Sequence, residues 1–340
     1  MLEQLKNAAE HINEISSKIK EDAERIRKNN FRINDALERE MIIEIKEIKI
    51  NGKVGAVDGG LLSQEMHGVD LVIARGAGVI FEYENSAMKN VKYYPDPFPK
   101  PKYSVKVGLE EHESNSFRSL FRLQEEIENA IQIVEKFSPK IILMDGSLIP
   151  LPQDKPNEEN GILEEYLKTK ELYKKLYSTC EKNKTALVGV IKDSRGKRFM
   201  DSLKGISNIN SSDSIFLDYL LKKRERTCTI KVGNDWRRHP ILKDFIEWEG
   251  KINLFYMKTS EEDRPMRVEF LSGILSADEI AGMMYSLNSI NKKYAYPAIL
   301  IEADLRAMLD AKEMERMQRT LQMFSHGKIN PLRRNSRPFR

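Results

Sequence analysis

Two aspartates that each close a short apolar run are the residues of this sequence best suited to chemistry. Asp58 closes the run Val54–Asp58 and Asp145 closes the run Ile141–Asp145, and glycine follows both. Apolar and β-branched runs of this length predict buried strands over 53–58 and 141–145. Two strands that each deliver an aspartate to a sheet edge can hold a divalent cation between them. Oxygen ligands of this kind suit magnesium or manganese and phosphate chemistry.

The neighbouring segments predict the sheet that carries these acids. Strands are expected over Val69–Ala74 and Gly78–Tyr83, with Arg75-Gly76-Ala77 as a turn between them and another turn at Gly59-Gly60. A helix is expected over 113–137, ahead of the strand that ends in Asp145. A meander, a helix and a parallel strand in this order predict an α/β fold of the RNase H-like (Argonaute PIWI-like) class with a mixed central sheet.

The helix expected over 113–137 offers a third acid. Glu126 follows Leu123 and precedes Ile127, so its side chain is expected at the edge of the buried face, towards the sheet. Glu125 and Glu128 are expected to point more towards solvent. We therefore predict Glu126 as a metal ligand, with Glu125 as the open alternative.

A last helix, expected over 298–323, offers a fourth acid. Its buried face is predicted to include Ile301, Leu305, Met308 and Leu309, and Asp304 neighbours two of these residues. Glu302 faces the same side less directly and remains the alternative. An unpaired charge on an apolar face is costly, and a bound metal would explain it.

Four such carboxylates predict a two-metal phosphodiesterase. Asp58, Glu126, Asp145 and Asp304 would gather divalent ions for in-line attack on a phosphodiester. Lys192 ends a further predicted strand, Thr185–Ile191, where it could neutralise phosphate charge. The residues predicted to contact DNA are Arg118, Arg122, Lys192, Arg195, Arg198 and Tyr296.

Composition excludes several other classes of protein. The 340 residues carry a net charge of only +4, so any nucleic-acid surface must come from local clusters of basic residues. The two cysteines, Cys180 and Cys228, lack the spacing of a zinc site or of a disulfide framework. No signal sequence or long apolar run occurs, which predicts a cytoplasmic protein without a membrane partner.

The chain divides by pattern into three parts. Residues 1–50 are expected to form an N-terminal helical extension, because apolar residues recur at three- and four-residue steps over 1–40. Its narrow apolar stripe suits a helix that packs on the outside of the domain, or one that forms a dimer or partner contact. Residues 51–323 form the predicted nuclease domain with insertions. Residues 324–340 contain a basic stretch with two prolines and are expected to be a flexible tail.

At several of these positions the sequence resembles the NurA nuclease family. The segments that carry the resemblance lie in family order across most of residues 50–310. They are Val57–Gly60, Arg122 with Glu126 and Ala130, Leu143–Ser147, Val190–Ser194, Pro265–Phe270 and Tyr296-Pro297.

The resemblance implies an RNase H-like nuclease domain that acts as a manganese-dependent 5′–3′ exonuclease and single-stranded DNA endonuclease, with magnesium as a possible substitute. It also implies a homodimer that works on single strands and duplex ends with a HerA-type hexameric ATPase in DNA end resection, for double-strand break repair and homologous recombination. One departure concerns the fourth ligand, because many members carry histidine after Tyr-Pro where this chain carries Asp304. Both side chains can bind manganese.

Two other functions use a similar sheet. An ATPase of the actin/sugar-kinase (ASKHA) type would use Asp58-Gly59-Gly60 and Asp145-Gly146-Ser147 as phosphate loops. That class needs Ser or Thr soon after the first glycines, and Leu61-Leu62 stands there instead. A catalytically inactive DNA-binding scaffold would not need the full set of acids. Metal-dependent cleavage of single-stranded DNA distinguishes the nuclease from both.

Overall fold

The chain forms two compact units in the computed structural model. The first unit comprises Met1–Ile50, Gly146–Leu148 and Val188–Ala298, and the second comprises Asn51–Asp145, Ile149–Leu187 and Ile299–Arg340. The structure describes residues 2–29, 31–156, 161–192, 194, 196–233, 235–288, 291–326, 329 and 332. Among the described helices, none combines the length and the apolar character that crossing a membrane requires.

A mixed sheet forms the framework of the second unit. β2 pairs in parallel with β6 and antiparallel with β3, and β3 is long enough to pair with β5 near its start and β4 near its end. This mixture of parallel and antiparallel strands confirms the predicted α/β class. The strands are β2 (Gly52–Met66), β3 (Val69–Glu84), β4 (Ala87–Tyr94), β5 (Lys102–Val107) and β6 (Ile141–Asp145).

The two turns predicted at glycines in this sheet are wrong. β2 continues through Gly59-Gly60 to Met66, and β3 continues through Gly76, which pairs directly with Gly59. The chain reverses instead at Gly68, whose φ is +75°. Glycine was needed inside the strands because a helix packs too closely for a side chain. A Cβ at Gly76 would lie 2.6 Å from the carbonyl oxygen of Glu125.

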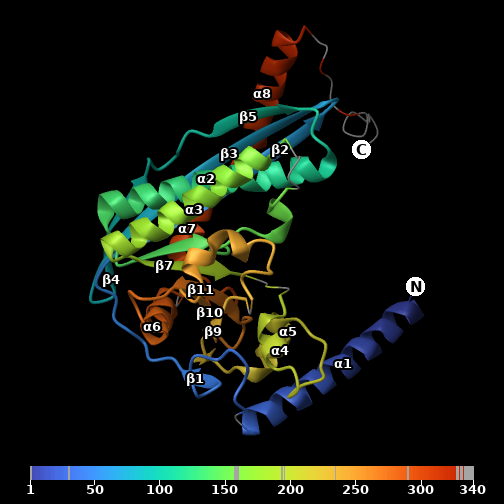
Figure 1. The fold of residues 1–340 in the computed structure, drawn as a ribbon, viewed down its shortest axis with the longest axis vertical. Coiled ribbons are helices and arrows are strands. Elements are labelled where there is room, and N and C mark those ends of the chain that lie inside the picture. Colours follow the sequence, from blue (N-terminus) through green and yellow to red (C-terminus); the bar gives the residue numbers. More distant parts are fainter. Residues whose placement is uncertain are drawn as a thin grey trace. The chain divides into compact units, whose positions relative to one another are not determined.

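Two long helices pack beside this sheet (Figure 1). α2 (Glu111–Phe137) contacts β2, β3 and β6, and α3 (Leu163–Asn183) lies alongside α2. The structure confirms the predicted helix over 113–137 and begins it two residues earlier. Glu110 and Glu113 form a reciprocal capping box at its start, and Ser138 adopts a left-handed conformation at its end. A short 3-10 helix, η1 (Pro152–Asp154), follows β6.

The single helix predicted over 298–323 is two helices, α7 (Ala298–Ala307) and α8 (Ala311–Phe324). Asp310 accepts a hydrogen bond from the Lys312 N–H and caps the start of α8. A new helix therefore begins there, and α7 does not continue into it. The predicted buried face is also wrong, because Leu305 and Met308 are exposed. The residues of α7 that are buried are Ile299, Leu300, Ala303 and Ala307.

The strands of the first unit are all antiparallel. They pair in the order β1-β8-β10-β11-β7, with β9 beside β10. They are β1 (Ile42–Glu44), β7 (Ala186–Ile191, which begins in the second unit), β8 (Glu225–Thr227), β9 (Ile230–Lys231), β10 (Ile252–Lys258) and β11 (Met266–Leu271). The helices are α1 (Leu2–Asn29), α4 (Arg198–Ser202), α5 (Asp213–Leu220), η2 (Leu242–Trp248) and α6 (Ala277–Leu287).

Helix α1 is shorter than predicted and only partly packed. It ends at Asn29 instead of near residue 40, and it contacts α5. Ile19, Ala23 and Ile26 in its second half are buried. In its first half, Leu2 and Leu5 are 81% and 62% exposed, so the apolar stripe predicted for this helix is not covered by the chain itself.

Candidate active site

Asp58 and Asp145 lie on neighbouring strands of the second unit. β2 and β6 run parallel with Val57 opposite Met144, so the next residues on both strands are the two aspartates. Side chains alternate along strands, and the two aspartates therefore share one face of the sheet. Asp58 is buried, and its Oδ1 accepts a hydrogen bond of 2.7 Å from the Gly59 N–H. The two aspartates therefore lie side by side on neighbouring strands, although Asp58 lies within β2 and not at its end, and their joint role as metal ligands stays a prediction.

The electrostatics of Asp58 reflect this crowding. Burial raises the pKa of Asp58 to about 7, and the nearby charge of Asp145 contributes to the increase. Asp304 raises this pKa further, whereas the Gly59 N–H and the Arg122 guanidinium lower it. A carboxylate in this position needs a positive charge in order to remain ionised.

Glu126 reaches the same region from α2. Its carboxylate occupies the space directly above Gly59, where a Cβ would lie 2.5 Å from Glu126 Oε1. Burial raises the pKa of Glu126 to about 8, with Asp58 and Asp145 adding to the effect and Arg122 opposing it. Glu126 is therefore within electrostatic range of both aspartates.

Arg122 is the cation that links these acids. Its guanidinium forms an ion pair with Glu126 one helical turn away, and the carboxylates of Glu126 and Asp58 raise its pKa. From the sequence, Arg122 is predicted only as a DNA contact, and this pairing is not foreseen. The spacing of four residues between Arg122 and Glu126 on a helix was the signal that could have revealed it.

The choice between Glu125 and Glu126 follows from their contacts. Glu125 does not point to solvent as predicted: it is 7% exposed, and its Oε1 lies 2.7 Å from Lys102 Nζ of β5. Burial raises the pKa of Glu125, and Lys102 lowers it. Because Glu125 already has a lysine partner away from Asp58, Glu126 is the residue of this pair placed near the aspartates.

Asp304 and Glu302 are also distinguished by their surroundings. Glu302 Oε1 accepts hydrogen bonds from Tyr93 (2.9 Å) and Arg306 (2.7 Å). Asp304 is exposed on α7 and acts electrostatically on Asp58. The expectation that Asp304 lies on a buried apolar face is wrong, because Asp304 is exposed and the buried residues of α7 are its neighbour Ala303 with Ile299, Leu300 and Ala307. Of the two acids, Asp304 is the one whose charge reaches the aspartate pair.

The chemistry of this donor set fits a divalent cation. Asp58, Asp145, Glu126 and Asp304 supply only carboxylate oxygens, the ligands that magnesium and manganese prefer. Within the described parts of the chain, no three acidic, histidine or cysteine side chains are already close enough to form a finished metal site. Carboxylates that repel one another are expected to close in only when a cation neutralises them.

Several residues predicted to bind DNA have internal partners in the structure. Arg118 pairs with Glu65 (2.8 Å) and Asp70 (3.0 Å) of the second unit. Arg198 of the first unit donates to the Lys231 carbonyl oxygen and pairs with Asp35 at 3.1 Å. These contacts support structural roles, and DNA binding by either arginine stays a prediction. Arg195 lies outside the described residues.

Lys192 and Tyr296 contact each other in the first unit. The Lys192 ammonium lies 4.0 Å from the centroid of the Tyr296 ring, and the Tyr296 hydroxyl donates to the Val190 carbonyl oxygen at 3.3 Å. This cation–π contact orders the end of β7. A role for Lys192 in neutralising phosphate, and for Tyr296 in contacting DNA, stays a prediction.

The segment after Asp145 is anchored by a buried acid that the sequence analysis did not single out. Glu269 of β11 is 1% exposed, and its Oε2 accepts hydrogen bonds from Ser147 Oγ (2.8 Å) and the Leu148 N–H (2.9 Å). Arg267 pairs with the same carboxylate at 2.5 Å. Within the first unit, these contacts join Ser147 and Leu148 to the motif at 265–270.

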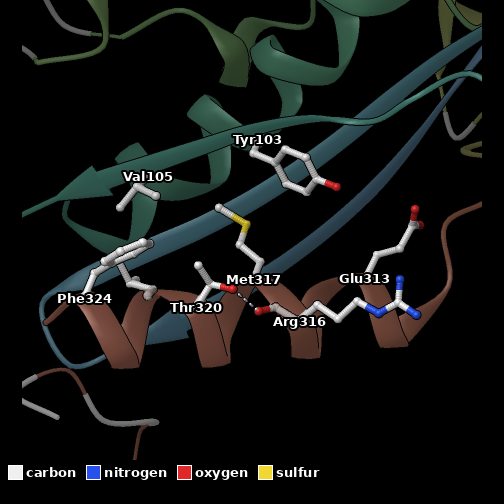
Figure 2. Close-up of a pocket in the computed structure, with 8 residues that line it drawn as sticks. Tyr103, Val105, Glu313, Arg316, Met317, Thr320 and Phe324 are labelled. Atoms are coloured by element: carbon white, nitrogen blue, oxygen red, sulfur yellow. Dashed lines mark hydrogen bonds between the residues drawn. The ribbon is translucent and has the colours of Figure 1, made fainter. Parts of the chain in front are cut away.

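The second unit also carries an apolar groove between α8 and β5 (Figure 2). Its volume is about 440 Å³, and Met317 and Phe324 of α8 face Tyr103 and Val105 of β5. Leu321 also lines the groove. The groove does not contain any of the four acids. It is therefore separate from the candidate active site.

The comparison with protein families decides which enzyme class this site belongs to. The model of the NurA domain matches residues 52–308, which include all four acids. The chain belongs to the NurA family. It is therefore assigned to a family of nucleases, enzymes that hydrolyse phosphodiester bonds, and the resemblance noted in the sequence is confirmed.

Solved NurA structures share the fold. The NurA nuclease from Sulfolobus solfataricus has a TM-score of 0.62 at 19% identity, covering 96% of each chain. A NurA structure bound to dAMP and manganese has a TM-score of 0.52 at 11% identity, covering 88% of this chain and 91% of the other. A third, with manganese, has a TM-score of 0.52 at 10% identity, covering 93% and 96%. No curated protein matches the chain.

Proposed function

We propose that this NurA protein is a manganese-dependent DNA nuclease that acts as a 5′–3′ exonuclease and as an endonuclease on single strands. The observation that carries the proposal is the placement of Asp58 and Asp145 side by side, with Glu126 in electrostatic range of both. The solved NurA structures with manganese and with dAMP support the metal and the class of substrate. Family membership favours this function over the ATPase and scaffold alternatives.

Each residue would have a separate task in this reaction. Asp58 and Asp145 would hold the cation at the sheet edge, and Glu126 and Asp304 would complete its coordination. Bound manganese would supply activation of water and stabilisation of the leaving 3′ oxygen. Arg122 would hold Glu126 above Gly59 through its ion pair. Lys192, at the end of β7, would balance phosphate charge.

Removal of the metal should abolish cleavage. We expect the protein to degrade a single-stranded oligonucleotide in manganese, to lose this activity in EDTA and to regain it when manganese is restored, because carboxylates alone do not activate water. Gel analysis of substrates labelled at the 5′ or the 3′ end measures both activity and polarity. Cleavage that persists in EDTA would contradict the metal dependence. Shortening from the 3′ end alone would contradict the proposed polarity.

We also propose that the protein works as a homodimer with a HerA-type hexameric ATPase in DNA end resection. The exposed apolar residues of α1 support a contact with another chain. Leu2, Leu5 and Ile12 are 81%, 62% and 60% exposed and recur at three- and seven-residue steps along one helix face. Such a stripe is typical of helices that pair with a second helix.

Charges placed on this stripe should dissociate the dimer. In the variant Leu5→Glu/Ile12→Glu, like charges replace the apolar contact, so we expect a monomer mass by light scattering after size exclusion. The matched control Asn7→Glu/His11→Glu adds the same charges on the opposite face of α1 and should remain dimeric. A stripe variant that keeps the dimer mass would assign the dimer contact to another surface. A monomeric wild-type protein would refute the dimer itself.

A further inference from the structure

A polar stripe on α2 leads away from the candidate active site. His112, Asn115, Ser119, Arg122 and Glu126 follow one another at steps of three and four residues, which places them on one face of the helix. The last two members belong to the acid cluster described above. Seven residues of helix separate Ser119 from Glu126, a distance of about 10 Å. The stripe therefore continues the active site along the helix.

A cavity lies over the first part of this stripe. Its volume is about 550 Å³, within the range of small-molecule binding sites. α2 forms one wall, and η1 with the residues after it forms the other. Ser116 Oγ joins the two walls by donating to the Gln153 carbonyl oxygen at 2.8 Å. The lining residues are His112, Asn115, Ser116 and Ser119 on α2, with Gln153, Asp154, Lys155 and Pro156 opposite.

Asp154 is the group in this cavity that lacks a full set of partners. Its side chain is almost completely buried, with 1% of the residue exposed. Oδ2 accepts from the Leu151 N–H at 2.8 Å, and the Ser119 hydroxyl opposes the rise that burial causes in the pKa of the carboxyl, but Oδ1 makes no hydrogen bond within the described parts of the chain. A buried acceptor without a partner costs free energy, which a ligand with an N–H donor would recover.

The chemistry of the walls specifies the kind of ligand. Asn115 and Gln153 carry amides, which both donate and accept hydrogen bonds as base edges require. Asp154 can accept from the exocyclic amino group of a base, and Lys155 supplies a positive charge for phosphate. A site for phosphate alone would not include a buried carboxylate. Nucleotides combine both requirements.

We propose that this cavity is a nucleotide subsite that takes one unpaired nucleotide of the substrate strand, next to the nucleotide at the cleaved phosphate. The inference rests on the proposed function, because it assumes that the strand passes along α2 to the acids. A base can enter a cavity only when it is unstacked and unpaired. The subsite thus supplies a physical reason for action on single strands.

Loss of the two amides should weaken binding of single-stranded DNA. We expect Asn115→Ala/Gln153→Ala to raise the Kd for an oligonucleotide of about 12 nucleotides by about tenfold, measured by fluorescence anisotropy in EDTA. Gln132→Ala removes a partly exposed amide on another face of α2; it is the matched control and should bind as the wild type does. Equal Kd values for the double variant and the wild type would overturn the subsite.

Abasic substitution should locate the nucleotide that occupies the cavity. One abasic position in the oligonucleotide should weaken wild-type binding and have no further effect on the double variant, because the two changes remove one shared contact. Penalties that are the same for both proteins at every position would overturn the proposal. Both binding measurements omit metal, so they decide the subsite even if the protein proves not to be a nuclease.

Cleavage of a small substrate distinguishes an effect on the subsite from an effect on the four acids. Bis(p-nitrophenyl) phosphate is too short to span about 10 Å from the acids to the cavity. In manganese, the double variant should cleave it at the wild-type rate while kcat/KM for the oligonucleotide falls about tenfold. An equal loss on both substrates would overturn the subsite, since it would indicate damage to the acid cluster.

Discussion

Replacement of Asp58 by asparagine should reduce phosphodiester cleavage by about 10³-fold. A metal-bound carboxylate contributes several kcal/mol of transition-state stabilisation, and about 4 kcal/mol corresponds to this loss in rate. Asparagine keeps the size of the side chain and the oxygen that accepts from the Gly59 N–H. The variant should therefore fold, and the loss should appear in kcat for an oligonucleotide in manganese.

The same substitution should stabilise the metal-free protein at alkaline pH. The pKa of Asp58 is about 7 in the folded protein and 3.8 ordinarily, so the folded state binds this proton more tightly. The resulting contribution to the free energy of unfolding is present below pH 3.8 and is lost as the pH rises through 7. Asparagine has no charge to bury. Its Tm should thus exceed that of the wild type at pH 8 but not at pH 5.

Thermal unfolding in EDTA and in manganese checks these expectations together. Manganese should raise the Tm of the wild type at pH 8 much more than that of Asp58→Asn, because the variant lacks a ligand. Asp96→Asn is the matched control: this exposed aspartate accepts from the Phe98 N–H in the same unit, and its replacement should change neither Tm nor rate. If Asp58→Asn cleaved DNA within tenfold of the wild-type rate, Asp58 would not be a ligand.

The pairing of Asp58 with Asp145 was predictable because local signals and topology agree. Both residues end apolar β-branched runs, and a helix between the runs makes parallel pairing the natural outcome. The lengths of β2 and β3 were not predictable from glycine alone. Gly59 and Gly76 carry the same local signal as a turn, but here they provide space for α2. Only the packed fold distinguishes these two uses of glycine.

Two other differences from the predictions arise from tertiary contacts and from competing local signals. Glu125 is buried because Lys102, which is 23 positions away on β5, pairs with it, and no local pattern shows this contact. The break between α7 and α8 was visible as Asp310 followed three residues later by Glu313, a helix-start signal. Strong helix formers on both sides of Asp310 favoured the prediction of one continuous helix over this start signal. The buried face predicted for that single helix was therefore wrong.

Gly59→Ala should remove most of the cleavage activity although it adds a single methyl group. The new Cβ would lie 2.5 Å from Glu126 Oε1 and 2.6 Å from Cγ, so the glutamate must leave its position. Its ion pair with Arg122 would then be disturbed. A shift of about 1 Å in a reacting group costs about 10²-fold in rate, and overpacking a core costs about 1–3 kcal/mol of stability. Oligonucleotide cleavage and urea unfolding measure the two effects.

Two further variants show whether the losses in Gly59→Ala come from displacement of Glu126 or from replacing a glycine by alanine in general. Among the described residues, no heavy atom lies within 4 Å of a Cβ placed on Gly161, so Gly161→Ala should change neither quantity. Combining Gly59→Ala with Glu126→Ala removes Cγ and the carboxylate of residue 126, and with them the clash. The double variant should therefore be more stable than Gly59→Ala alone, in spite of carrying a second change in a buried site. If the two substitutions instead lowered stability additively, the Glu126 carboxylate would not lie against Gly59. The proposed placement of Glu126 by α2 would then be wrong.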